Sequence, residues 1–146
     1  KEDEPIKPSS PYASSKVAFD LYLLSISKFL NFPMNIIRPS NAYCPGQLLH
    51  RIIPKTIVSG LIGNKVPLHG GGRAEKSYIH ARDLGRAIYL VSEKAPLGKI
   101  YNAGYENNTI LELGNTVKNV VGDDVELISS RTDDNTCIRC GRSGCP

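Results

Sequence analysis

The chain lacks several features that would point to particular classes of protein. It has no tryptophan, and aromatic residues make up only 7% of its 146 residues. The formal net charge is +4, but lysine and arginine form no long run and do not alternate with aromatic residues, so nucleic-acid binding has no support. No apolar stretch approaches the length of a membrane span, and the charged first residues, KEDE, lack the apolar region of a signal peptide. We therefore expect a cytoplasmic protein whose partners include neither nucleic acid nor membrane.

Cysteine is also too scarce for a disulfide framework, because a chain of this length holds only four. Three of them, Cys137, Cys140 and Cys145, crowd near the C-terminus. Three soft ligands fall short of the four that a structural zinc site generally takes, so we expect no metal site. A truncated or frame-shifted end is the first explanation of this tail, and a minor metal site is the alternative.

One helix near the start brings together two side chains that can share a proton. Tyr12 and Lys16 are four residues apart, a spacing that puts both on one helix face, one turn apart. Ser10 is a suitable N-cap and Pro11 a suitable first residue, which predicts a helix that ends near Asn31. An ammonium beside a phenol lowers the phenol pKa from about 10, and such a pair can act as a general acid/base near neutral pH. A lone Y-x-x-x-K more often lies on a solvated surface, so the surrounding motifs must decide.

The rest of the chain alternates helical and extended patterns, which predicts an α/β fold. Short apolar runs predict strands at 34–37, 66–69, 78–80, 100–102 and 125–128. Helical periodicity predicts helices over 52–62, over 84–93 with Asp83 as the cap, and from a capping box at 109–112 to about 121. The stretch 70–72, Gly-Gly-Gly, is a tight loop, and no G-x-G-x-x-G spacing for a dinucleotide phosphate occurs in the sequence.

Six short motifs follow one another in a definite order: PSSPYASSK (8–16), IRPSNAY (37–43), PGQ (45–47), LHGGG (68–72), SYIHARD (77–83) and IYNAG (100–104). Together they resemble the C-terminal half of an extended short-chain dehydrogenase/reductase. More narrowly, they resemble the NAD-dependent nucleotide-sugar epimerases and dehydratases. Among these, the sequences of the motifs look most similar to those of the dTDP-glucose 4,6-dehydratases. The resemblance runs from about Glu4 to about Ser130.

The resemblance implies the C-terminal part of a Rossmann-like fold with an interleaved small substrate-binding lobe. Residues 1–47 and 80–104 would be a remnant of the NAD-binding domain, 48–79 and 105–130 the substrate-binding lobe, and 131–146 a divergent tail. Because the glycine-rich phosphate turn of the family precedes the part matched here, we expect a fragment that does not measurably bind NAD by itself. The full-length form is expected to be a homodimer.

The resemblance also implies a reaction. NAD⁺ would accept a hydride from the sugar while Tyr12 takes the hydroxyl proton, and Lys16 would activate the tyrosine and bind the nicotinamide ribose. Arg38, Pro39 and Ser40 would lie near the nicotinamide. The keto-sugar would then lose water in a 4,6-dehydratase, which is the first expectation, or be re-reduced on its other face in a 4-epimerase. An alternative of another class is a non-catalytic remnant with a metal-binding tail.

Five further side chains are expected to contact the nucleotide-sugar: Asn41, His69, Arg73, Lys76 and Asn102. The family usually has arginine where Lys76 stands, and lysine keeps the charge but loses the bidentate fork. Without the resemblance, the asparagines would be ordinary turn residues and the cations surface charge. The family also usually has glycine where Cys44 stands, and a positive φ there would strain the cysteine.

Overall fold

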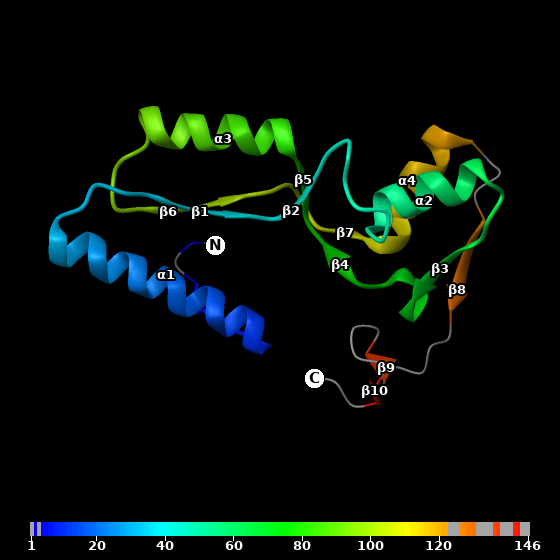
Figure 1. Ribbon diagram of the computed structural model, residues 1–146, viewed down its shortest axis with the longest axis horizontal. Coiled ribbons are helices and arrows are strands. Elements are labelled where there is room, and N and C mark those ends of the chain that lie inside the picture. Colours follow the sequence, from blue (N-terminus) through cyan, green and yellow to red (C-terminus); the bar gives the residue numbers. More distant parts are fainter. Residues whose placement is uncertain (1, 3, 123–125, 131–135, 138–141, 144–146) are drawn as a thin grey trace. The chain divides into compact units, whose positions relative to one another are not determined.

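The computed structural model describes residues 2, 4–122, 126–130, 136–137 and 142–143 (Figure 1). Helices and strands alternate along the chain, so the predicted α/β class is confirmed. The chain forms two compact units, each assembled from two separate stretches. Unit 1 comprises Lys1–Ala42 and Ile79–Gly104, and unit 2 comprises Tyr43–Tyr78 and Tyr105–Pro146.

Unit 1 is a parallel strand pair between two helices. Strands β1 (Ile36–Pro39) and β6 (Ile100–Ala103) run parallel, with Arg38 opposite Asn102. Helix α1 (Pro11–Leu30) lies on one side of the pair and helix α3 (Ala81–Lys94) on the other (Figure 1). The sequence predicts the first strand at 34–37, two residues before its observed start, and the side chain of Asn35, just ahead of the strand, bonds to the chain at two other points. Its amide donates to the carbonyl of Val91 at 3.5 Å and accepts from the Lys99 N–H at 3.1 Å.

Helix α1 begins and ends as predicted. The Ser10 hydroxyl caps it by accepting a hydrogen bond from the Ala13 N–H at 3.1 Å, and Pro11 is its first residue. Asn31 ends it in the left-handed conformation, with φ at 50°, and donates its backbone N–H to the Ser27 carbonyl. Asparagine tolerates that conformation better than most residues, which explains why the helix stops there.

Helix α3 begins three residues earlier than predicted, and Asp83 is not its cap. His80 takes the N-cap position, where its Nδ1 accepts a hydrogen bond from the Arg82 N–H at 3.2 Å. Asp83 lies in the first turn, where a carboxylate still interacts favourably with the helix N-terminus. The cap preference for short oxygen side chains misses His80, since an imidazole nitrogen can accept the same bond.

Unit 2 is built on a second parallel strand pair and two packed helices. Strand β3 (Val66–His69) pairs in parallel with β8 (Leu127–Ser130), and β4 (Glu75–Lys76) pairs antiparallel with β7 (Asn108–Thr109). Helix α2 (Ile52–Leu61) packs on α4 (Ile110–Val121), and a 3₁₀ turn, η1 (Gly70–Gly72), follows β3. The core centres on the buried Val66 and Leu68, against which pack Ile52, Ile110, Val121 and Leu127.

Four short strands complete the description. Strands β2 (Asn41–Tyr43) and β5 (Tyr78–His80) span two of the points at which the chain crosses between the units. Strands β9 (Thr136–Cys137) and β10 (Arg142–Ser143) pair antiparallel.

The predicted capping box of α4 is confirmed. The Thr109 hydroxyl accepts from the Glu112 N–H at 3.1 Å, and the Glu112 carboxylate accepts from the Thr109 N–H at 2.7 Å. These hydrogen bonds from Thr109, the backbone bond first, hold the pKa of the Glu112 carboxyl below its usual value. The helix ends at Gly122, also as predicted.

Cys44 is exposed and its thiol is free. Among the non-glycine residues that the structure describes, a positive φ occurs at Asn31 alone, so the condition under which cysteine would strain the backbone at position 44 is not met. The turn that follows instead uses Gly46, with φ at 82°.

Most of the tail 131–146, including Cys140 and Cys145, lies outside the described residues. Within the described residues, no group of histidine, cysteine or acidic side chains could hold a metal ion. Across the same part of the chain, no helix combines the length and apolar character that crossing a bilayer requires.

Candidate active site

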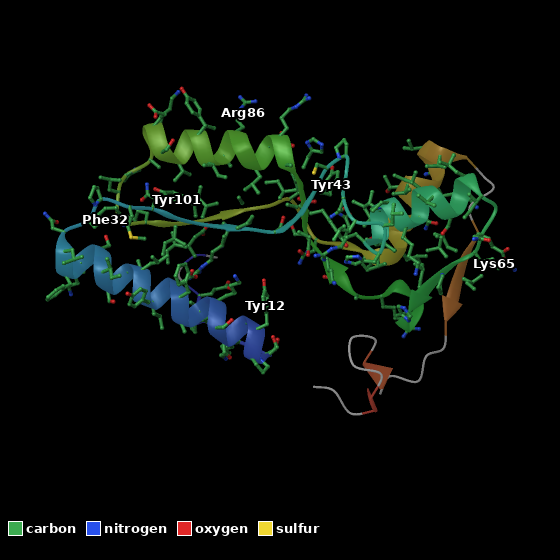
Figure 2. All side chains as sticks on the ribbon, viewed as in Figure 1. Tyr12, Phe32, Tyr43, Lys65, Arg86 and Tyr101 are labelled. Carbon is green, nitrogen blue, oxygen red and sulfur yellow. The ribbon has the colours of Figure 1, made fainter. Side chains whose placement is uncertain are left out.

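Tyr12 and Lys16 lie one turn apart on α1, as their spacing predicts. The Lys16 Nζ is 5.5 Å from the centroid of the Tyr12 ring, within the range of a cation–π contact. The Tyr12 side chain is 68% exposed and lies near the N-terminal end of the helix (Figure 2).

These two side chains line a pocket of unit 1. Its volume is about 620 Å³, and its lining includes Tyr12, Lys16 and Asp20 from α1 and Ile37, Arg38 and Pro39 from the β1 region. Pockets that hold small ligands are typically about 300–1,000 Å³ in volume. The structure therefore brings four of the predicted residues, Tyr12, Lys16, Arg38 and Pro39, to one cavity of suitable size.

An ion pair crosses this pocket from strand to helix. The Arg38 Nε donates to the Asp20 Oδ2 at 2.7 Å, and the two side chains are 26% and 17% exposed. A charge-assisted hydrogen bond that is partly removed from water is among the stronger polar contacts in proteins. Sequence reasoning misses Asp20, although its position one turn beyond Lys16 puts it on the helix face of the Tyr12/Lys16 pair.

Ser40 directly follows the pocket residue Pro39. Its backbone N–H donates to the Ala103 carbonyl at 2.8 Å, whereas its side-chain oxygen is buried without a hydrogen-bond partner. Native proteins rarely leave a buried hydroxyl unsatisfied, so this atom is a candidate contact for a polar ligand group.

The two predicted asparagines belong to the same end of the parallel strand pair. Asn41 opens β2, just past the carboxyl end of β1, and Asn102 lies in β6; both are exposed. The backbone N–H of Asn102 donates to the Glu2 carboxylate at 3.0 Å, and this bond lowers the pKa of Glu2. Ligands of open α/β sheets bind beyond the carboxyl ends of their strands, where Arg38 to Asn41 lie.

His69, Arg73 and Lys76 belong to unit 2. His69 ends β3, Arg73 follows η1, and Lys76 lies in β4 with its backbone opposite Asn108. All three residues are exposed, so their side chains are accessible to a ligand without any rearrangement of the core.

Unit 2 contains a second pocket, of about 510 Å³, which is lined by helices α2 and α4 and by Tyr43, Tyr78 and Tyr105. It is largely apolar, and none of the predicted substrate residues lines it. Burial raises the pKa of the Tyr78 hydroxyl, while the positive charge of Arg51 acts in the opposite direction.

Comparison with known proteins gives consistent matches. Residues 1–104 match the model of the NAD dependent epimerase/dehydratase family. The chain is 36% identical over 103 residues to dTDP-glucose 4,6-dehydratase of Streptomyces griseus, a match that covers 70% of this chain and 31% of the relative. It is 37% identical over 103 residues to the dTDP-D-glucose 4,6-dehydratase of Homo sapiens, covering 70% and 29%.

Solved structures agree with these relatives. The dTDP-glucose 4,6-dehydratase from Bacillus anthracis, in complex with NAD, matches with a TM-score of 0.80 at 32% identity, covering 91% of this chain and 44% of that one. The UDP-glucose 4-epimerase from Thermus thermophilus, in complex with NAD, matches with a TM-score of 0.79 at 28% identity, covering 89% and 44%. The predicted Rossmann-like α/β fold is confirmed. The chain spans less than a third of the length of the two curated relatives and less than half of the two solved chains.

Proposed function

Since this chain belongs to the NAD dependent epimerase/dehydratase family, we propose that it carries the catalytic pair and the substrate contacts of a nucleotide-sugar 4,6-dehydratase. The observation that carries the proposal is the Lys16 ammonium, 5.5 Å from the Tyr12 ring centroid, beside a pocket formed with Arg38. The reaction is proposed for a polypeptide that also contains a dinucleotide-binding half. In this proposal, unit 1 meets the cofactor, and five exposed polar residues of the chain meet the sugar nucleotide.

The residues of unit 1 fit the nicotinamide end of NAD. The pocket of about 620 Å³ has the size for such a group, and the Ser40 hydroxyl next to it lacks a partner. The Lys16 ammonium can donate to ribose hydroxyls, and Arg38, Pro39 and Ser40 can form the wall against the ring. When bound, NAD⁺ supplies the acceptor for a hydride from the sugar.

Within this site the protein moves the proton. Tyr12 takes the proton of the sugar hydroxyl as the hydride leaves, and Lys16 stabilises the phenolate that can accept it. The high exposure of Tyr12 suits this role, because its hydroxyl must reach a substrate that enters from solvent. The resulting ketone would acidify the neighbouring C–H bond and so allow water to leave. The hydride and a proton would then return to the unsaturated sugar, so that the net change is the loss of one water.

Five residues would hold the sugar nucleotide. Asn41 and Asn102 offer amide groups near the carboxyl ends of β1 and β6. Arg73 and Lys76 offer two cations for phosphates, and His69 offers a ring nitrogen or a stacking face for the base. Their exposure supports the assignment of His69, Arg73 and Lys76.

A 4-epimerase is the second candidate. It is supported by the Thermus thermophilus epimerase, whose TM-score of 0.79 nearly equals that of the Bacillus anthracis dehydratase at 0.80. Tyr12 and Lys16 would serve an epimerase equally well, because both reactions begin with oxidation of the sugar.

The test joins this chain to the dinucleotide-binding half of the Streptomyces griseus relative and supplies dTDP-glucose and UDP-glucose. A dehydratase yields a product lighter by one water in mass spectrometry, whereas an epimerase yields an isomer of equal mass that NMR distinguishes. Tyr12→Phe is the matched control. Turnover that is absent while NAD binds would reject the enzyme and favour the non-catalytic remnant, whereas turnover that is equal in both proteins would reject the role of Tyr12.

We also propose that the complete enzyme is a homodimer. Helix α1 buries none of its residues and exposes large apolar side chains, among them Phe19, Leu21, Tyr22 and Phe29. A second α1 is an apolar surface that could cover them. Light scattering on the joined enzyme should give the mass of two chains, and a monomer mass would contradict the proposal.

A further inference from the structure

Two cations compete for one carboxylate in the unit 1 pocket. Lys16 and Asp20 are four residues apart on α1, a spacing at which side chains of opposite charge can pair. Asp20 instead pairs with Arg38 of β1 at 2.7 Å, and the Lys16 Nζ lies over the Tyr12 ring, 5.5 Å from its centroid. The ammonium is therefore directed to the phenol and not to the carboxylate one turn further along the helix.

Physical chemistry favours this choice of partners. The Arg38 and Asp20 side chains are only 26% and 17% exposed, so their attraction is less screened than that of exposed charges. A guanidinium also matches a carboxylate better than an ammonium does. The competing pair has lysine N-terminal to the acidic residue, which is the weaker order in a helix.

We propose that Arg38 is a positioning residue that occupies Asp20 and thereby keeps the Lys16 ammonium on Tyr12. The proposal rests on the proposed function only in assigning a catalytic role to the Tyr12/Lys16 pair. Without Arg38, Asp20 would be a mostly buried carboxylate whose nearest partner on its own helix is Lys16. Pairing with a cation would then be strongly favourable, because an unpaired charge that is largely removed from water raises the free energy of the folded state. Lys16 would then turn away from Tyr12.

The other charged groups around the pocket do not provide a substitute. Tyr12, Lys16 and Asp20 face it from α1, and Arg38 faces it from β1. The charge of Arg38 contributes to the lowered pKa of Glu2, so the two groups interact. Glu2 is itself acidic, however, and cannot replace Arg38 as the partner of Asp20.

The experiment is NMR on the 146-residue chain with labelled tyrosine and lysine, in the absence of NAD and sugar. The probe is the nuclear Overhauser effect between the Lys16 ε-protons and the Tyr12 ring, together with the upfield ring-current shift of those protons. Tyr12→Phe, which keeps the ring but moves its signals, identifies the cross-peaks.

We expect the effect in the original chain and a several-fold loss in Arg38→Gln. Arg38→Lys, which can still pair with Asp20, should keep it. The double variant Arg38→Gln/Asp20→Asn should recover it, because neither charge then remains to draw Lys16 away. A general loss of structure would not be reversed by removing a second charge, so recovery separates positioning from a merely structural role.

The proposal is overturned if Arg38→Gln keeps the effect, if the double variant stays as weak as the single one, or if Asp20→Asn alone abolishes it. The double variant, which has no unpaired charge, keeps the test informative if Arg38→Gln does not fold. Since no cofactor or substrate is present, failure here leaves the proposed reaction standing. Conversely, absent turnover in the joined enzyme does not alter this result.

Discussion

Gly72 lies so close to Leu111 that a β-carbon at position 72 would be 3.0 Å from the backbone nitrogen of Leu111. Gly72 is buried and has a φ of 71°, a conformation that L side chains rarely adopt. It lies at the end of η1, between Leu68 of β3 and Leu111 at the start of α4. The neighbouring atom belongs to backbone, which cannot swing aside as the end of a side chain can.

We therefore predict that Gly72→Ala destabilises unit 2 by about 2–4 kcal/mol, through overpacking and conformational strain together. Gly70→Ala is the matched control, because Gly70 also has a positive φ, 57°, but a β-carbon there meets no atom within 4 Å. It should cost only about 1–2 kcal/mol. Urea unfolding measures both, and equal losses would show that the contact with Leu111 carries no cost.

Tyr12→Phe in the joined enzyme should lower turnover by roughly 10²–10⁴-fold, because it removes the proton acceptor but keeps the ring under Lys16. The affinity for NAD should change little. Steady-state kinetics and calorimetric titration with NAD⁺ measure the two quantities. Turnover close to that of the parent would remove Tyr12 from the reaction.

Lys76 should be a phosphate contact of the same enzyme. Lys76→Ala is expected to weaken nucleotide-sugar binding, most of all at low salt, and Lys76→Arg to preserve or tighten it through a bidentate contact. Lys65→Ala is the matched control, since Lys65 is an exposed lysine of unit 2 that pairs with Glu126 at 3.0 Å (Figure 2). Identical affinities for Lys76→Ala and the parent in calorimetry would make Lys76 ordinary surface charge.

The capping box should give the stability of unit 2 a dependence on pH. The Thr109 hydrogen bonds lower the pKa of Glu112 from 4.5, so its contribution to stability is complete above that value. It is lost as the pH falls through the lower, folded-state pKa. Glu112→Gln keeps an acceptor for the cap but cannot titrate, so it should reduce the loss of stability between about pH 6 and about pH 3. Denaturant unfolding at the two pH values measures this, and an unchanged difference would contradict it.

Removing the hydroxyl of Thr109 tests the other half of the same cap. Thr109→Ala should lower the free energy of unfolding by about 1 kcal/mol, the usual loss for an N-cap. The matched control is Thr116→Ala, because that hydroxyl only donates to the Glu112 carbonyl one turn back in the helix. Denaturant unfolding should show a clearly smaller effect for the control, and an equal or larger one would contradict the assignment.

The sequence predicts those features that depend on neighbours along the chain. The Ser10 cap, the Thr109/Glu112 box and the stop at Gly122 each involve residues within one turn, so local chemistry is sufficient. The spacing of Tyr12 and Lys16 likewise fixes their common face once the helix is given.

Features that depend on packing between distant segments are not predictable in this way. The pair of Asp20 and Arg38 exists only because α1 lies beside β1, and the unpartnered hydroxyl of Ser40 depends on what surrounds it after folding. Ahead of the first strand, the Asn35 side chain binds Val91 and Lys99, which are 56 and 64 residues away in the sequence. No local pattern carries that information.

The pairing of β1 with β6 has a consequence for synthesis on the ribosome. Ile36 pairs with Ile100, so β1 cannot pair with β6 until all of residues 40–99 have been made. At about 5–20 residues per second, that delay lasts several seconds, far longer than a helix such as α1 needs to form. During that interval the edge of β1 that β6 later covers stays unpaired, and such an edge is a natural target for a chaperone that holds extended segments.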